Sequence, residues 1–285
     1  MIHCPTIGIL GCGFLGQEIA RQVDWPEDSW GTKLRVPAVV PEENGPLRLF
    51  SFDWQAKEQW EKLPSHPTAL VLTIPPILSE VNKESERLKR WGDWMNRHRP
   101  QSETLVYIST TGVYPNQDGH WDETSLFESD NSRGLLRLAT EKTLAEFFNL
   151  KVLRAGGIYG ENRHIGQRIV SGKPIPEGNH PVHRIHVTDL AQIVRLSLLQ
   201  DSFPALINAV DLEPAPTATV AKWLLKQNYK EIPFGTQLTF KSGFATRKNL
   251  PAVDNRFISN RRLIEKCHYQ FIYPTYKEGF RSIYA

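Results

Sequence analysis

A glycine-rich turn near the start of the chain constrains the fold more than any other feature of the sequence. Gly11, Gly13 and Gly16 follow the apolar run Ile7–Leu10 and precede a helical pattern that extends to Val23. A strand, a glycine turn and a helix in this order form a dinucleotide-binding unit. The first glycine permits a tight turn, the second lets the backbone approach a pyrophosphate, and the third allows close helix packing. The free N–H groups of the helix then face the phosphates.

Short β-rich runs alternate with helical patterns over the first half of the chain. Strands are expected at residues 6–10, 47–52, 69–73, 104–109 and 151–154, with a further short strand near 33–36. Helices are expected at 15–23, 56–63, 78–97 and 134–148. This alternation is typical of an α/β protein with a Rossmann-type, doubly wound parallel sheet.

The character of the sequence changes after about residue 160, where glycine, proline and histidine become frequent. Helical patterns resume at 188–199 and 217–226. We predict an NAD(P)-binding domain over residues 1–160 and a smaller C-terminal α/β cap lobe over 161–285, with helix 188–199 returning to the core. The cap is expected to close over the C-terminal edge of the strands, where open sheets bind ligands. The polar, acidic loop 116–133 is either functional or mobile.

Composition excludes several other classes of protein. The net charge of +3 gives no reason to expect nucleic acid or an anionic membrane as a partner. No apolar run approaches the roughly 20 residues that span a bilayer. The three cysteines show no CxxC spacing, which argues against a disulfide framework and a zinc site and favours the cytoplasm. His183 and His186 would face opposite ways on an extended segment, so no metal is expected.

The stretch that follows the first helix bears on the choice between NADP and NAD. NAD-binding proteins usually place an acid about 20 residues beyond the glycines, on the ribose 2′-hydroxyl. Residues 31–35 contain Thr32, Lys33 and Arg35 but no acid, which favours the 2′-phosphate of NADP, with NAD as the alternative. The two cations are otherwise solvated residues at a strand end. Asp53 either accepts a hydrogen bond from the adenine amino group or caps a helix that begins near residue 55.

Two further strand ends lie on the same predicted edge of the sheet. Thr73, Ile74 and Pro75 either line the cofactor site or form a plain exit from a strand. Thr110 lies within three successive hydroxyl residues at the end of a central strand. The reactive end of a bound dinucleotide would lie there, although turns also favour such residues.

Four segments carry recognisable motifs. Residues 109–114 read Ser-Thr-Thr-Gly-Val-Tyr, 119–124 Gly-His-Trp-Asp-Glu-Thr, 153–160 Leu-Arg-Ala-Gly-Gly-Ile-Tyr-Gly, and 184–191 Arg-Ile-His-Val-Thr-Asp-Leu-Ala. With the glycine turn, their order and spacing resemble the extended short-chain dehydrogenases of the NAD(P)-dependent epimerase/dehydratase group over nearly the whole chain. Residues 161–164 and 257–263 resemble the atypical, YeeZ-like branch of this group.

The resemblance also reveals a departure at the catalytic position. In the group, a catalytic Tyr lies four residues before a Lys, and a Glu lies four residues beyond it. Lys142 and Glu146 match the Lys and the Glu, but Leu138 stands at the Tyr position and cannot transfer a proton. Lys142 would then hold only the ribose hydroxyls, or it is simply a solvated helix residue. Thr110 corresponds to the Ser that orients the substrate.

An enzyme of this kind needs an acid or base near the carbonyl carbon that reacts. Tyr114, Tyr159 and His186 are the alternatives to the missing tyrosine, and each has a stronger structural interpretation, as packed turn residues or a hydrogen-bonded strand residue. The predicted catalytic residues are Thr110, Lys142 and Tyr114.

The predicted cofactor-binding residues come from the glycine turn, the strand ends and the helix that carries the lysine. They are Gly11, Gly13, Phe14, Leu15, Gly16, Thr32, Lys33, Arg35, Asp53, Thr73, Ile74, Pro75, Thr110, Lys142 and Gly157.

Two functions follow from these predictions. The first is an NAD(P)-dependent oxidoreductase resembling sugar-nucleotide epimerases and dehydratases, acting on an unknown small carbonyl or nucleotide-sugar substrate. The alternative is a non-catalytic NADP(H)-binding sensor or regulatory protein. A homodimer through helices 78–97 and 134–148 and a monomer both stay open.

Overall fold

A seven-stranded parallel sheet forms the centre of the computed structural model, which describes residues 4–22, 25–36, 47–64, 67–100, 102–232, 236–242 and 255–285. Its strand order is β11-β7-β5-β4-β1-β2-β3, so the chain reverses direction across the sheet between β1 and β4. The strands are β1 (Ile7–Leu10), β2 (Trp30–Lys33), β3 (Arg48–Ser51), β4 (Ala69–Leu72), β5 (Thr104–Thr110), β7 (Asn149–Ala155) and β11 (Leu206–Ala209). The predicted doubly wound α/β fold is confirmed.

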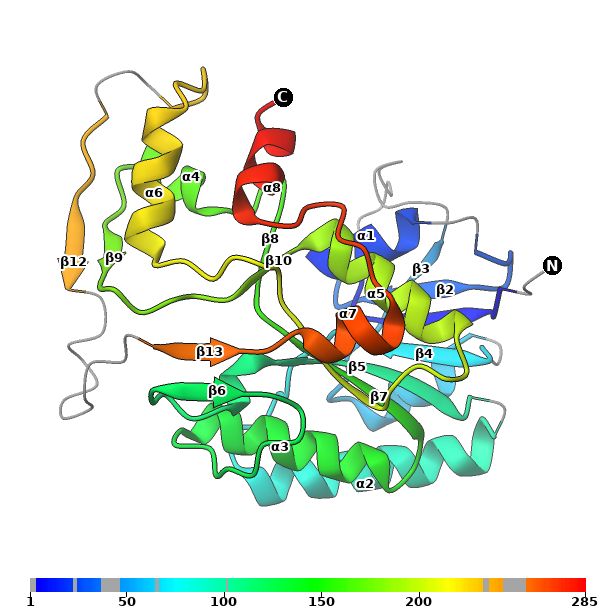
Figure 1. Ribbon diagram of the computed structural model, residues 1–285. Helices are drawn as coiled ribbons and strands as arrows, with labels where there is room; N and C mark the ends of the chain where they lie inside the picture. The colour runs from blue at the N-terminus through cyan, green and yellow to red at the C-terminus, as the bar shows by residue number, and fades with distance from the viewer. Residues whose placement is uncertain are drawn as a thin grey trace.

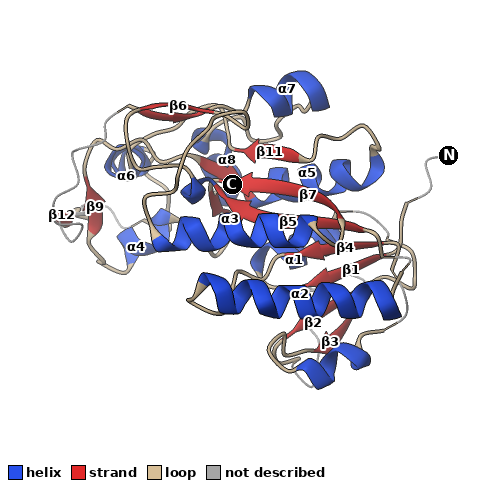
Figure 2. Ribbon diagram, turned by 90° about the horizontal axis from the view of Figure 1, so that it is seen from below, coloured by secondary structure: helices blue, strands red, loops and turns tan. Residues whose placement is uncertain are grey.

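Helices cover both faces of this sheet (Figures 1 and 2). The helices are α1 (Phe14–Arg21) and α5 (Val187–Leu199) on one face, and α2 (Val81–His98) and α3 (Ser132–Ala145) on the other. Side chains alternate along each strand, so Ile7 and Ile9 join the core under α1 and α5 while Leu10 joins the core under α2 and α3. Trp91 of α2 is fully buried in that second core.

A separate group of elements forms a cap beyond the C-terminal edge of the sheet (Figure 1). It comprises α4 (Ile165–Val170), β9 (Ile175–Glu177), α6 (Thr217–Lys226), β12 (Phe240–Ser242) and α8 (Tyr276–Ile283). These elements enclose a third core that includes Val220, Leu224 and Phe280. The parallel pair β8 (Gly157–Tyr159) and β10 (Arg184–His186) lies between the sheet and the cap.

The C-terminal part of the chain also pairs with the acidic loop. Within residues 116–133, β6 (Gly119–Trp121) forms a parallel pair with β13 (Arg256–Ile258), and α7 (Arg261–Cys267) follows (Figure 1). The loop therefore contains an ordered strand.

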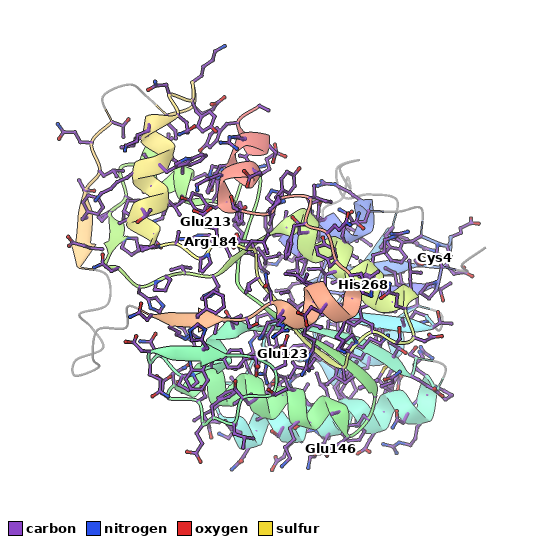
Figure 3. The ribbon with its side chains drawn as sticks, viewed as in Figure 1. Cys4, Glu123, Glu146, Arg184, Glu213 and His268 are labelled. Carbon is purple, nitrogen blue, oxygen red and sulfur yellow. The ribbon has the colours of Figure 1, made fainter. Side chains whose placement is uncertain are left out.

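Two buried charged side chains fix this loop to the rest of the fold. Arg256 donates hydrogen bonds to the carbonyl oxygens of Thr111, Tyr114 and Pro115, at 2.8, 3.2 and 2.8 Å. Glu123, labelled below α7 in Figure 3, accepts a hydrogen bond from a backbone N–H of β11 at 2.7 Å. Burial raises the pKa of Glu123.

Several elements differ from the prediction. The strand expected near 33–36 lies earlier, as β2, because the pairing with β1 joins Gly8 to Trp30. Residues 57–62 form a 3₁₀ helix, η2 (Lys57–Lys62), rather than an α-helix. Helices α4, α7 and α8 were not predicted. Val23, the expected end of the first helix, lies outside the described residues.

Within the described ranges, no helix combines the length and the apolar character that crossing a membrane requires.

Candidate functional site

The three glycines of the turn play three different structural roles. Gly11 has φ +104°, and a Cβ there would lie 2.5 Å from the Thr73 hydroxyl oxygen. A Cβ on Gly16 would collide with the carbonyl oxygen of Gly11, so only glycine lets α1 pack this close to the turn. Above Gly13 the space is open, since a Cβ would meet nothing within 4 Å. This is the arrangement that lets a phosphate approach the backbone.

A cavity of about 490 Å³ opens from this turn, and we call it the glycine-turn pocket. It runs from the start of α1 to the C-terminal end of β5, and its far end is lined by Ser109 and Arg137. Seven of the predicted site residues line it: Gly13, Phe14, Leu15, Thr73, Pro75, Thr110 and Gly157.

Other predicted cofactor residues have local structural contacts outside this lining. The Thr32 hydroxyl accepts a hydrogen bond from the Gly11 N–H at 3.0 Å and donates to the Ile9 carbonyl at 3.3 Å. Asp53 accepts from the Gln55 N–H at 2.9 Å, a local turn contact, whereas η2 begins after Ala56 without a side-chain cap, so the predicted capping role of Asp53 is wrong. Lys33 ends β2 and Arg35 is exposed beyond it. The Ile74 side chain lies 2.7 Å from the position that a Cβ on Gly11 would take.

The residue of α3 that lines the glycine-turn pocket is not the one that the sequence predicted. Lys142 is exposed and does not line the pocket, and Leu138 packs against the apolar cluster of Val113 and Ile258. Arg137 lines the pocket instead. It donates hydrogen bonds to the hydroxyl of Tyr107 at 2.7 Å and to the carbonyl of Ile108 at 3.1 Å.

The Tyr-Lys-Glu motif of the epimerase/dehydratase group can also be aligned with α3 five residues earlier, and this alignment agrees with the residue that lines the pocket. Arg133, Arg137 and Glu141 are spaced four residues apart, as Tyr, Lys and Glu are in the epimerase/dehydratase group. Residues at this spacing share one helix face. In this register, Arg137 stands at the Lys position and Arg133 at the Tyr position. Sequence reasoning missed both residues, although the spacing of the acid was a signal.

Glu141 anchors that helix face to the end of β5. Its carboxylate accepts a hydrogen bond from the Ser109 hydroxyl at 2.5 Å and pairs with Arg154 through bonds of 3.2 and 2.7 Å. All three side chains are buried. Because buried charges require such pairing, this network fixes the pocket end of α3 against the sheet.

The three alternatives to the missing tyrosine are all engaged by the fold. Tyr114 is buried, donates to Asn208 at 2.9 Å, and has a pKa raised by burial. The Tyr159 hydroxyl lies 3.4 Å from the Thr275 carbonyl, and burial raises its pKa. His186 accepts from a backbone N–H at the start of α5, and burial lowers its pKa to about 4. Tyr114 and His186 do not line the glycine-turn pocket.

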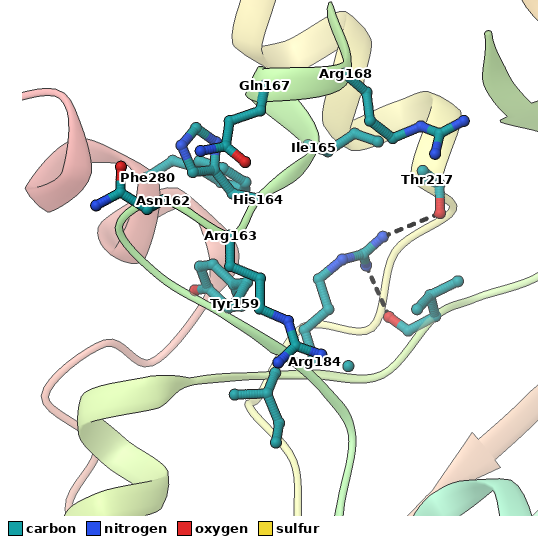
Figure 4. Close-up of a pocket in the computed structure, with 13 residues that line it drawn as sticks. Tyr159, Asn162, Arg163, His164, Ile165, Gln167, Arg168, Arg184, Thr217 and Phe280 are labelled. Atoms are coloured by element: carbon teal, nitrogen blue, oxygen red, sulfur yellow. Dashed lines mark hydrogen bonds between the residues drawn. The ribbon is translucent and has the colours of Figure 1, made fainter. Parts of the chain in front are cut away.

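A second cavity of about 400 Å³, the cap pocket, adjoins the first (Figure 4). Its lining includes Arg163, Arg168 and Arg184, together with Tyr159 and His164. Burial lowers the pKa of His164. The two cavities share part of their lining, so they lie next to each other between the glycine turn and the cap.

In the part of the chain that the structure describes, no group of three or more His, Cys, Asp or Glu side chains could hold a metal ion. The three cysteines are free.

Comparisons with known proteins agree with this architecture. No family model matches the chain. Protein YeeZ from Escherichia coli (strain K12) is 28% identical over 134 residues, which are 46% of this chain and 48% of YeeZ. The matched region therefore spans about half the length of this curated relative.

Solved structures resemble nearly the whole chain. A functionally unknown conserved protein from Silicibacter pomeroyi has a TM-score of 0.76 at 23% identity, covering 98% of both chains. UDP-glucuronic acid 4-epimerase from Bacillus cereus, solved in complex with NAD, has a TM-score of 0.74 at 14% identity, covering 98% of this chain and 95% of the epimerase. The resemblance to the epimerase/dehydratase group is confirmed in the fold, and the match to Protein YeeZ agrees with the predicted YeeZ-like resemblance.

Proposed function

We propose that this protein is an NAD(P)-dependent oxidoreductase of the epimerase/dehydratase type. One observation carries the proposal: the open space above Gly13 leads into a pocket that ends at Thr110 and Arg137. The pyrophosphate would approach the backbone at Gly13, and the nicotinamide end would lie near the hydroxyl of Thr110. The adjoining cap pocket would hold a small carbonyl compound or a nucleotide sugar.

The residues of the chain would bind and orient both ligands, while the dinucleotide supplies the hydride chemistry. The Arg137 guanidinium would hold ribose hydroxyls or a developing negative charge. The Thr110 hydroxyl accepts from the Gly112 N–H at 3.1 Å, which leaves its proton free to be donated to a substrate oxygen. Tyr159 and His164, which line the cap pocket, are the groups we propose for exchanging a proton.

We propose NADP as the preferred cofactor and NAD as the alternative. The support is the lack of an acid in residues 31–35 and the position of Lys33 at the end of β2. A 2′-phosphate beside Lys33 and Arg35 would gain charge-assisted hydrogen bonds.

A non-catalytic NADP(H) sensor is a second function, favoured by one observation. The described lining of the glycine-turn pocket includes hydroxyls and two arginines but no Tyr, Lys, His, Cys, Asp or Glu. Such a pocket can bind a dinucleotide without providing a proton donor near neutral pH.

Two sets of measurements test these proposals. NADPH and NADH are titrated separately, and tryptophan quenching is followed. Tight binding of NADPH alone supports the cofactor preference, equal binding refutes it, and binding of neither refutes both functions. Turnover of UDP-sugars is then measured with the native chain and with Arg133→Tyr combined with Arg137→Lys. Activity in either supports the oxidoreductase, whereas cofactor binding without activity in both supports the sensor.

We further propose a cofactor lobe over residues 1–160, a cap lobe over 161–285 and a cytoplasmic location. A homodimer through α2 and α3 is a further proposal, because these helices lie side by side over one face of the sheet (Figure 2). Native mass spectrometry of the purified chain tests the dimer.

A further inference from the structure

Arg163 occupies the junction of the two cavities. It lines both the glycine-turn pocket and the cap pocket, and the other shared residues, Gly157 and Ile158, carry no charge. Arg163 is therefore the charged side chain common to the described linings of both cavities. From this position, the Arg163 side chain could contact a ligand that extends along the glycine turn.

The backbone turn that carries Arg163 is tightly defined. Gly160 and Arg163 exchange backbone hydrogen bonds of 3.2 and 3.1 Å, and Asn162 between them has φ 60°. A Cβ on Gly160 would lie 2.6 Å from the Val187 side chain and 3.2 Å from the Phe14 ring. The turn thus presses against the starts of α1 and α5, which fixes where the arginine side chain begins.

The guanidinium of Arg163 lies over the glycine turn. Its central carbon is 5.3 Å from the centroid of the Phe14 ring, and Phe14 directly follows Gly13. A guanidinium over an aromatic ring keeps its N–H groups free at the edge. Among the described residues, none accepts a hydrogen bond from this guanidinium.

Each of the neighbouring arginines donates at least one hydrogen bond to a protein group. Arg184 donates to the Val182 carbonyl at 2.8 Å and to the Thr217 hydroxyl at 3.3 Å (Figure 4). It also donates to the Ala215 carbonyl at 2.7 Å. Arg137 is bonded at the end of β5, and Arg168 donates to a carbonyl beyond α4 at 2.7 Å. No Asp or Glu lines either cavity in the part of the chain described. An anion at the junction would therefore meet free donors on Arg163 and no nearby lining carboxylate.

We propose that Arg163 binds a diphosphate from the cap side, opposite the backbone N–H groups of the glycine turn. The diphosphate could belong to the dinucleotide or to a substrate. The dinucleotide is favoured because the ring under the guanidinium is Phe14, at the start of α1, next to the open space over Gly13. This inference rests on the proposed cofactor site and adds the cap as a contributor to it.

The test measures the binding of ADP-ribose and UDP by calorimetry, because these probes represent the two sources of diphosphate. Arg163→Gln should weaken ADP-ribose binding roughly tenfold to a hundredfold, the range expected for a charged hydrogen-bond donor. UDP binding should change less than threefold. Arg163→Lys should retain part of the ADP-ribose affinity. Arg97→Gln is the matched control, because Arg97 is exposed on α2 and lines neither cavity.

Several results would overturn the proposal. One is an unchanged ADP-ribose affinity in Arg163→Gln, and another is an equal loss of ADP-ribose affinity in Arg97→Gln. A third is that Arg163→Gln loses UDP binding but keeps ADP-ribose binding, which would assign the diphosphate to the substrate. Thermal unfolding of each variant checks that the chain is folded, and Arg163→Lys provides the comparison if Arg163→Gln is not. If the native chain binds neither ADP-ribose, NADPH nor NADH, the cofactor site itself fails. If the native chain binds these ligands and the Arg163 variants bind them equally well, only the inference about Arg163 is refuted.

Discussion

Adding one methyl group at Gly13 or at Gly16 should separate cofactor binding from stability. Gly13 has φ −81° and ψ −150°, an extended conformation that alanine adopts, and its Cβ would point into open space. The unfolding free energy of Gly13→Ala should stay within about 1 kcal/mol of the native value. The methyl would, however, occupy the space through which a pyrophosphate reaches the backbone. Loss of one charged hydrogen bond there, about 1.5–3 kcal/mol, weakens NAD(P)H binding roughly tenfold to a hundredfold.

Gly16→Ala should have the opposite effect. Its methyl would collide with the Gly11 carbonyl oxygen and would lie 3.2 Å from the Ile9 side chain, so the backbone must move. Overpacking of this kind costs about 3 kcal/mol, of which improved helix propensity returns about 1 kcal/mol. A net loss near 2 kcal/mol is expected.

Urea unfolding followed by tryptophan fluorescence measures the stability of both variants, and calorimetry with NADPH and NADH measures their affinity. Unchanged affinity in a folded Gly13→Ala would refute the assignment of the open space to the cofactor. Native stability in Gly16→Ala would refute the packing argument.

Three further predictions concern α3 and a buried acid. Arg137→Ala should weaken NAD(P)H binding about tenfold in calorimetry, whereas Lys142→Ala should change the affinity by less than about twofold. A larger loss of affinity in Lys142→Ala than in Arg137→Ala would support the register predicted from the sequence. Glu141→Ala leaves the buried Arg154 unpaired and should lower the free energy of unfolding by about 3–5 kcal/mol, as measured with urea. The control Glu146→Ala removes an exposed carboxylate and should lower it by less than about 1 kcal/mol. Similar losses in the two variants would contradict this argument. Burial raises the pKa of Asp211 to about 8, and the unfolded chain loses this proton near pH 4. The folded state holds the proton longer, so its unfolding free energy should fall as pH rises from about 4 to 8, and Asp211→Asn should flatten that slope in urea unfolding at several pH values. Parallel slopes would show that Asp211 does not titrate in this range.

The sequence predicted the sheet well because its signals are local. The apolar runs of β1 and β4 and the glycine turn between strand and helix each lie within a few residues. The strand β2 was misplaced because Trp30-Gly31-Thr32-Lys33 lacks a strand pattern and owes its position to pairing with β1 and β3. Short helices such as α4 and α8 depend on the cap core, which no local pattern reveals.

The candidate site was predicted less completely than the fold. The turn residues and Thr110 line the pocket as a set, because strand ends of a parallel sheet meet at one edge. The register of α3 could not be decided from spacing, since 138/142/146 and 133/137/141 both end in a Glu and neither contains the Tyr. The contact of Glu141 with Ser109 decides which face meets the sheet, and that contact is tertiary. Arg163 belongs to the segment 161–164 that resembles the YeeZ-like branch, but its place between the two cavities and over the Phe14 ring is a tertiary feature.

The pairing of β6 with β13 has a consequence for the time course of folding. Arg256 bonds to the Pro115 carbonyl across 141 positions of sequence, and to Thr111 across 145. Contacts between such distant segments close large loops and form slowly. During synthesis, the segment beside Thr110 must wait for nearly the whole chain to emerge before its last partners arrive. The strand end on which the site depends should thus be among the last parts of the molecule to reach its native conformation.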